Sequence, residues 1–324
     1  MEKLVTILTA FADLLVFDWL GFDADSLLAN ALHFFIIGFS EIVVLVILVT
    51  YLMGILTSYL PMNRIRLFLE KHKKSGLGNI LASLLGAITP FCSCSSIPLF
   101  VGMMQSRIPL GIALSFLITS PLVNEIAIAI FWATYGWKVT VIYVLSGIVL
   151  GIIGGIVLDA MGMSKYLADW VQNLAVSETT NTTDHRPFLV RFPEIHREVI
   201  QTLKKLIPYI FIGLAIGSVI HGYVPESFFE QYISKSNPFA VPIAVITAIP
   251  LYIDAVGILP IIDSLVNKGV PLGTAIAFMM AAIGLSVPEA LLLKKVMKKP
   301  LIIAFFTTIG LGMILSGFLF NQLF

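Results

Sequence analysis

Charge is scarce in this chain, where Asp, Glu, Lys and Arg together make up 12% of 324 residues. A soluble domain carries about twice that fraction. Hydrophobic residues make up 58% of the chain and the mean hydropathy is +0.98. Several apolar runs approach or exceed the ~20 residues needed to cross a bilayer. The composition excludes an ordinary soluble domain and predicts an all-α, multi-pass membrane protein whose first partner is the lipid bilayer.

Other absences narrow the function. The net charge is +1, so nothing favours nucleic acid as a partner. No P-loop motif is present, which argues against a nucleotide-driven machine. The two cysteines, Cys92 and Cys94, are too few for a disulfide framework. We expect no cofactor and no enzymatic activity.

Apolar runs and polar breaks divide the chain into four parts. They are an N-terminal helix with its loop (1–30), a first membrane repeat (31–162), a polar linker expected in the cytoplasm (163–198) and a second membrane repeat (199–324). Whether the N-terminal helix spans the membrane stays open. The expected spans are Leu32–Leu60, Ile108–Ala133, Val139–Leu158, Ile200–His221, Val270–Leu293 and Leu301–Phe320. In each repeat a further apolar segment, Asn79–Met104 or Phe239–Val266, is broken by prolines.

The two halves resemble each other in sequence. Ile108–Phe116 matches Val270–Phe278 without a gap, and upstream Thr89-Pro90 matches Ile249-Pro250. Such a match in the same order indicates an internal repeat. Glycines spaced by four residues, at Gly147, Gly151 and Gly155, predict close helix packing in the first half.

Charge predicts the relative orientation of the halves. The loop after the first long span carries five basic residues (Arg64, Arg66, Lys71, Lys73 and Lys74), which places it in the cytoplasm. The matching loop of the second half is acidic, with Glu226 and Glu230. Matching loops on opposite sides predict inverted-topology repeats, each with three transmembrane helices and one broken segment. The arms of each broken segment are too short to cross singly, so we expect two re-entrant hairpins whose tips meet near the midplane.

The two hairpin tips differ in chemistry. The first tip lies in Thr89-Pro-Phe-Cys-Ser-Cys-Ser-Ser-Ile-Pro98, and the second is Leu251–Gly257. Two thiols could bind soft species such as Cu(I), zinc or trivalent arsenic. The candidate solute-binding residues are Cys92, Cys94, Ser93, Ser95, Ser96, Asn124 and Tyr252. The alternative for both cysteines is a role as small packing residues.

Acids at membrane depth are the candidates for proton coupling. An acid at the bilayer centre costs at least ~2.5–3.5 kcal/mol on insertion scales, so it usually marks an ion path or a pair. The candidates are Asp254 in the second tip, Glu125 and Glu289 late in matched spans, and Glu41 in the first long span. For Glu289, an interfacial cap is the alternative, since Lys294 follows within about a turn and a half.

These motifs resemble a known family. Thr89–Phe100, Pro109–Gly111, Thr119–Pro121 and Leu285–Glu289 are similar to segments of the predicted permeases of ArsP/YraQ type, over roughly residues 30–322. The resemblance implies a multi-pass permease of the bacterial or archaeal inner membrane, which in some members exports trivalent organoarsenicals. We therefore expect a secondary transporter, proton-coupled, that exports a soft thiophilic solute such as methylated trivalent arsenic. Two alternatives stay open, a membrane thiol oxidoreductase using Cys92 and Cys94, and a channel built from the same hairpins.

Overall fold

The computed structural model describes residues 76–89, 93–123, 125–176, 237–250 and 269–324, together with parts of 9–51, 193–215 and 258–266. Secondary structure in this part of the chain is helical, apart from an isolated β-bridge between Leu167 and Met297. The elements are the π-helix η1 (Leu14–Trp19), α4 (Leu77–Ile88), α5 (Ser93–Gln105), α6 (Leu110–Leu122), α7 (Glu125–Ala160), the 3-10 helix η3 (Met163–Tyr166), α8 (Asp169–Val176), α11 (Ala240–Ala248), α13 (Leu272–Gly284), α14 (Val287–Leu293) and α15 (Lys299–Leu323).

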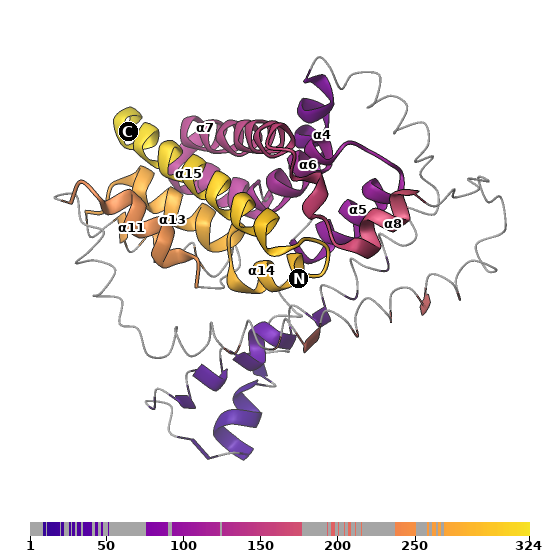
Figure 1. The fold of residues 1–324 in the computed structure, drawn as a ribbon. Helices are drawn as coiled ribbons and strands as arrows, with labels where there is room; N and C mark the ends of the chain where they lie inside the picture. The colour runs from indigo at the N-terminus through magenta and orange to yellow at the C-terminus, as the bar shows by residue number, and fades with distance from the viewer. Residues whose placement is uncertain are drawn as a thin grey trace.

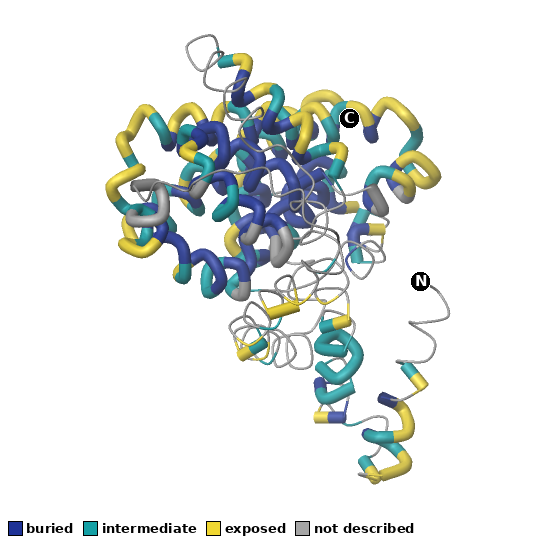
Figure 2. Tube along the Cα trace, turned by 90° about the vertical axis from the view of Figure 1, so that its right-hand side faces the viewer, coloured by how far each residue is buried: buried dark blue, intermediate teal, exposed yellow. Residues whose placement is uncertain are grey.

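Two central helices are surrounded by the others. Every residue of α6 is buried, and so are 11 of the 13 residues of α13. Helix α6 packs against α4, α5 and α7, while α13 packs against α11 and α15. Figure 2 shows the buried residues gathered in the middle of the bundle, with exposed residues around it. A helix that is apolar all round belongs in such a core.

The outer helices are suited to lipid. Among the described residues, the stretches long and apolar enough to cross a membrane are Phe131–Ala160, Leu272–Leu293 and Lys299–Leu323. Leu145 in α7 and Leu315 in α15 are 55% and 70% exposed. Apolar side chains facing outward on helices of this length are typical of a bilayer environment. The expectation of an all-α, multi-pass membrane protein is confirmed.

Two of the expected spans are interrupted. The sequence predicts continuous spans over Ile108–Ala133 and Val270–Leu293, but α6 ends at Leu122 before α7 begins, and α13 ends at Gly284 before α14 begins. In the second half the restart has a clear local cause. Ser286 is the N-cap of α14, and its Oγ accepts a hydrogen bond from the Glu289 N–H. Pro121 lies in the last turn of α6 and weakens its continuation.

The internal repeat extends from sequence to backbone. Helices α6 and α13 both contain 13 residues, and matched residues differ by 162 in number, as for Leu110 and Leu272. Each helix begins after a proline with nearly the same dihedral angles, φ −53° and ψ 138° at Pro109 against φ −57° and ψ 136° at Pro271. The same offset relates Gly136, where α7 leaves helical geometry with φ 80°, to Lys298, the N-cap of α15. The match found in the sequence therefore reflects an equivalent course of the chain.

The repeated Pro-Leu-Gly motif has a packing cause. A Cβ atom at Gly111 would lie 2.7 Å from Asp159 Cβ and 2.8 Å from the Gly155 carbonyl oxygen. A Cβ at Gly273 would lie 2.5 Å from both the Gly317 carbonyl oxygen and the Asn321 backbone nitrogen. Both glycines therefore allow the central helix to touch the backbone of the helix beside it. The expected close packing along Gly147, Gly151 and Gly155 is confirmed, since a Cβ at each would meet α6.

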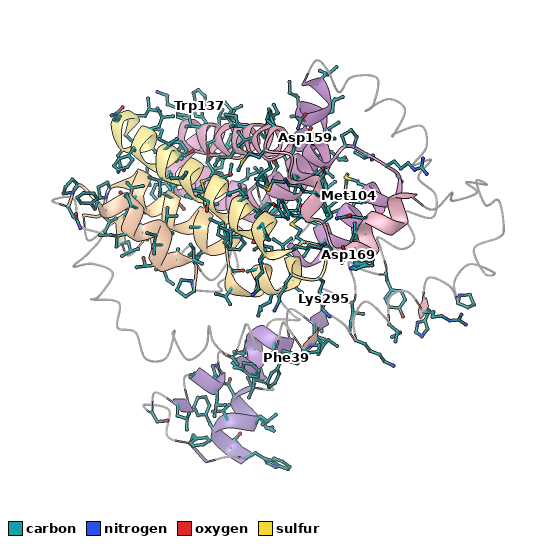
Figure 3. The ribbon with its side chains drawn as sticks, viewed as in Figure 1. Phe39, Met104, Trp137, Asp159, Asp169 and Lys295 are labelled. Atoms are coloured by element: carbon teal, nitrogen blue, oxygen red, sulfur yellow. The ribbon has the colours of Figure 1, made fainter. Side chains whose placement is uncertain are left out.

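Equivalent helices of the two halves meet across the centre. Helices α7 and α15 pack together, and the Leu150 side chain occupies the space that a Cβ at Gly312 would need. Leu150 and Gly312 are equivalent positions, so the two halves meet here at matching residues. Helix α7 runs from Trp137 toward Asp159, whereas α15 runs from the side of Lys295 back toward the end that holds Trp137 (Figures 1 and 3). The two equivalent helices therefore run in opposite directions.

The beginning of the segment expected as a linker is folded onto the second half. The Ala168 N–H donates to the Val296 carbonyl, the Lys298 N–H donates to the Tyr166 carbonyl, and the Trp170 indole donates to the Lys295 carbonyl. Lys298 Nζ lies 2.5 Å from Asp169 Oδ1. Helix α8, which follows, packs against α5. Figure 3 shows Asp169 and Lys295 at this junction.

Described parts of the first span in each half also contact each other, in the region drawn below the bundle in Figure 1. The Phe211 ring meets Phe35 and Phe39 edge-on, with centroid distances of 5.0 and 5.7 Å. Near the N-terminus, His33 Nε2 lies 2.8 Å from Asp13 Oδ1.

The substitution Gly273→Ala is expected to destabilise the protein by about 1–3 kcal/mol, because backbone atoms of α15 occupy the space of the new methyl group. The midpoint of thermal unfolding of the purified protein in detergent measures the effect. Gly310→Ala is the matched control, since its Cβ would lie 3.6 Å from Leu285 Cδ1, an ordinary contact. Equal midpoints for both variants would contradict the close approach.

A second prediction concerns the contact between the two halves at Leu150 and Gly312. In a protein with Cys92→Ser and Cys94→Ser, the pair Leu150→Cys and Gly312→Cys should react with a short bifunctional thiol reagent to give an intramolecular cross-link, because the two side chains share one space. Mass spectrometry of the joined peptides identifies the link. The control pair Leu145→Cys and Leu315→Cys points outward and should give none. Cross-linking of both pairs alike would contradict the contact between Leu150 and Gly312.

Candidate functional site

Four interruptions of the helices define the candidate site. One lies between α4 and α5, where the first tip falls, and one follows α11, where the second tip falls. The other two are the breaks between α6 and α7 and between α13 and α14. Interrupted backbone at membrane depth is tolerated where it is surrounded by protein or lines a water-filled cavity. These points are where a solute could meet backbone and polar groups.

The two helix breaks meet at the centre. Leu122 Cδ2 lies 2.6 Å from the position of a Cβ at Gly284, and these residues, the last of α6 and of α13, are equivalent. Matching positions of the two halves thus contact each other here, as Leu150 and Gly312 do. The break of one half therefore lies directly against the break of the other. Val123, Leu285 and Ser286 in the two breaks are buried.

Specific hydrogen bonds satisfy the interrupted backbone. The Tyr143 hydroxyl donates to the Leu122 carbonyl oxygen at 2.5 Å, at the end of α6. In the second half the Val287 N–H donates to the Ile249 carbonyl oxygen at 3.2 Å. Ile249 follows α11 directly, so this bond joins α14 to the arm that leads into the second tip. The break and the hairpin of the second half are thereby held together.

The two halves also contact each other beside the helix breaks. Helix α5 of the first half packs against α14 of the second. Asp263 of the second half interacts electrostatically with the Tyr135 hydroxyl in α7 of the first. The helix that carries Glu289 therefore lies beside α5, which begins within the cysteine–serine segment (Cys92–Ser96).

Glu289 is a buried acid in this region. It is 1% exposed and is the third residue of α14. Taking a carboxylate out of water costs several kcal/mol unless partners compensate. By the constant offset Glu289 is equivalent to Ala127, which is also fully buried, whereas Glu125 is equivalent to Val287. When the two halves are aligned, Glu289 therefore lies two positions further along the chain than the position that matches Glu125.

A buried polar cluster connects the first hairpin with α6. The Asn79 amide donates to Ser115 Oγ at 2.9 Å, and the hydroxyls of Ser96 and Ser120 share a hydrogen bond of 2.8 Å. Ser83 is also fully buried in α4. Asn79, Ser83 and Ser115 were not singled out by the sequence. A comparison of the halves could have found Ser115, because the equivalent residue of α13 is Ala277.

The residues expected from the sequence fall into three groups. Ser96 and Glu289 are described in full, and both are buried. Ser93, Cys94 and Ser95 form the first turn of α5, and Glu125 begins α7, so their helices place them at two of the four interruptions. Outside the described residues lie Cys92, Asn124, Tyr252, Asp254 and Glu41. Within the described residues there is no cluster of three or more His, Cys, Asp or Glu that could hold a metal ion.

Comparison with known proteins identifies a family. The family model ArsP_1, described as predicted permease, matches residues 27–322. The chain is similar to the UPF0718 protein MJ0584 of Methanocaldococcus jannaschii, with 22% identity over 79% of this chain and 85% of that protein. It is similar to the UPF0718 protein YraQ of Escherichia coli, with 23% identity over 67% of this chain and 60% of that protein. A further match, with 26% identity over 41% of this chain and 40% of the other, is a Streptococcus mutans protein named as a subunit of a two-component membrane permease complex. No solved structure matches the chain.

Proposed function

This chain belongs to the predicted-permease family ArsP_1, and on that premise we propose that it is a secondary transporter that binds its solute between the interrupted helices of two inverted repeats. The solute is a soft thiophilic species such as methylated trivalent arsenic. Transport is coupled to protons and directed outward across the inner membrane.

The contact between the two helix breaks carries the proposal. Leu122 and Gly284 meet, as Leu150 and Gly312 do, which is what a pseudo-twofold relation between the halves would give, and the first residue of α14 bonds to Ile249 at the end of α11. In transporters built from repeats, solute and coupling ions bind at the repeat interface, where discontinuous helices leave backbone groups available. A protein with only a structural role in the membrane has no need of four interruptions near one another.

The opposite directions of α7 and α15 support inverted repeats (Figure 1). Two equivalent spanning helices that run antiparallel enter the membrane from opposite sides. The basic residues Lys294, Lys295, Lys298 and Lys299 around the start of α15 agree with a cytoplasmic position, whereas the matching region of α7 carries Lys138. Re-entrant hairpins then follow for α4–α5 and for the segment after α11, because α4 and α11 contain 12 and 9 residues, too few to span.

The solute class follows from the first tip. Cys92 and Cys94 would supply two thiolate ligands, and soft ligands select soft metals and metalloids. Cys94 is the second residue of α5, and the positive end of a helix is a favourable place for a thiolate. Ser93, Ser95, Asn124 and Tyr252 would complete the polar lining, and the buried Ser96 would support it from behind through its bond to Ser120.

Protons are the proposed coupling ion, because the chain has no nucleotide-binding motif and carries acids at membrane depth. Asp254 lies in the second tip, and Glu289 lies beside α5 of the other half. Glu125 and Glu41 would complete a relay. Binding of a positively charged or thiol-reactive solute at the first tip and release of a proton from these acids would then be linked.

The test of the solute class is the variant Cys92→Ser/Cys94→Ser. Serine keeps the size and polarity but removes the soft ligand, so the affinity for methylarsenite should fall about 10-fold or more, which corresponds to ~1.4 kcal/mol. Uptake of methylarsenite into inverted vesicles, and resistance of a sensitive host, measure the change. Ser146→Ala is the control, since that hydroxyl bonds to its own helix at the Tyr143 carbonyl. Unchanged uptake by the cysteine-free protein would reject the thiol ligands.

Proton coupling is tested at Asp254 and Glu289. Asp254→Asn and Glu289→Gln keep the shape of each side chain but cannot ionise, so accumulation driven by a pH gradient should be lost while exchange of labelled for unlabelled solute persists. Asp169→Asn is the control, because Asp169 is an exposed acid paired with Lys298 outside the bundle. Gradient-driven accumulation by both acid variants at the normal rate would rule out these residues as proton carriers.

A further inference from the structure

One hydrogen bond ties the first hairpin to the centre of the protein. Ser96 is the fourth residue of α5, two residues after Cys94, and Ser120 lies in the last turn of α6. Their Oγ atoms are 2.8 Å apart, and the residues are 0% and 1% exposed. The bond therefore connects the first turn of the helix that begins at the cysteine–serine segment with a central helix that cannot shift without disturbing the core.

The second half has no hydroxyl at the equivalent place. The constant offset of 162 pairs Ser115, Thr119 and Ser120 of α6 with Ala277, Ala281 and Ala282 of α13, and all three alanines are fully buried. The same helix course is thus compatible with alanine at each position. Packing alone does not require a hydroxyl at residue 120.

The hydrogen bond between Ser96 and Ser120 restricts the relative position of the two helices in a way that buried alanines do not. Apolar contacts between small side chains tolerate sliding along the helix, whereas a hydrogen bond needs a narrow range of distance and angle. The pair consequently restrains the first turn of α5 relative to α6.

We propose that Ser120 is a positioning residue: through Ser96 it holds the first turn of α5, and with it Cys94, in the geometry that binds the solute. The inference rests on the proposed function only in assigning solute binding to the cysteine–serine segment. Pre-organised ligands bind more tightly because less ordering is needed on binding. Loss of the bond should therefore weaken binding while leaving the later steps of transport almost unchanged.

The variant Ser120→Ala reproduces the residue of the second half and is expected to fold. In transport of methylarsenite it should raise KM about fivefold, the change expected from one net hydrogen bond, with kcat nearly constant. Ser96→Ala should do the same, and the double variant should be no worse than either single one. The conservative variant Ser120→Thr keeps a hydroxyl, so its KM should stay close to that of the unsubstituted protein.

A second readout does not depend on transport. In the Cys92→Ser background, the rate of Cys94 alkylation by N-ethylmaleimide should change at least about threefold on adding Ser120→Ala, since a turn that is no longer fixed exposes its thiol differently. Thr119→Ala is the matched control, because the adjacent Thr119 hydroxyl donates to the Ser115 carbonyl of its own helix at 2.9 Å. It should leave the alkylation rate unchanged.

The outcomes separate the two proposals. If Cys94 is alkylated at the same rate in the Cys92→Ser protein with and without Ser120→Ala, the positioning role is overturned. The same holds if Cys94 is alkylated in neither protein. A changed labelling rate together with normal methylarsenite transport by the cysteine-free protein would keep the positioning role and reject the thiol-ligand function. An equal effect of Thr119→Ala would show a general weakening of α6 and would also overturn the positioning role.

Discussion

The constraint on which this structure depends is that interrupted backbone inside a bilayer needs partners from the protein itself. The chain is interrupted between α4 and α5, after α11, and at the two helix breaks. The bonds from Tyr143 to the Leu122 carbonyl and from Val287 to the Ile249 carbonyl supply such partners. They are possible because α6 and α13 lie in the centre, covered on all sides. The shell of helices around them thus allows the breaks to exist.

Glycines at equivalent positions of the two halves allow these helices to pack closely. Gly111 and Gly273 let the central helices touch the backbones of α7 and α15, so the same motif serves the same contact in both halves. The polar residues do not follow this rule. Tyr143 is matched by Phe305, and Ser120 is matched by Ala282. The repeated scaffold therefore carries different polar groups in its two halves, and these departures from the repeat are more informative about a site than the repeat itself.

Much of the fold could be read from the sequence, because its causes are local. Proline and glycine mark backbone positions directly, which is why Pro109 and Pro271 aligned the halves correctly and the last helix was expected within a few residues of its bounds. The breaks after Leu122 and Gly284 were missed, since hydropathy averaged over a span does not register two residues. The bond between Ser96 and Ser120 was also beyond reach, because it depends on how α5 turns back onto α6. The register of Glu125 and Glu289 follows from the offset of the sequence match, and the structure adds that this offset is kept as far as Gly136 and Lys298.

The junction between α14 and α15 shows how the equivalence of the halves is limited. Gly136 and Lys298 occupy the same position in the repeat, and the chain leaves helical geometry at both. Among the described residues, another segment bonds to Lys298, through the Tyr166 carbonyl and the Asp169 carboxylate. That segment continues into α8, which packs on α5. The α14–α15 junction is therefore connected to α5 by two routes, directly from α14 and through α8. At the matching Gly136 the described residues show a side-chain bond from Thr140 of the same helix, so the two halves share their course at this point but not the contacts around it.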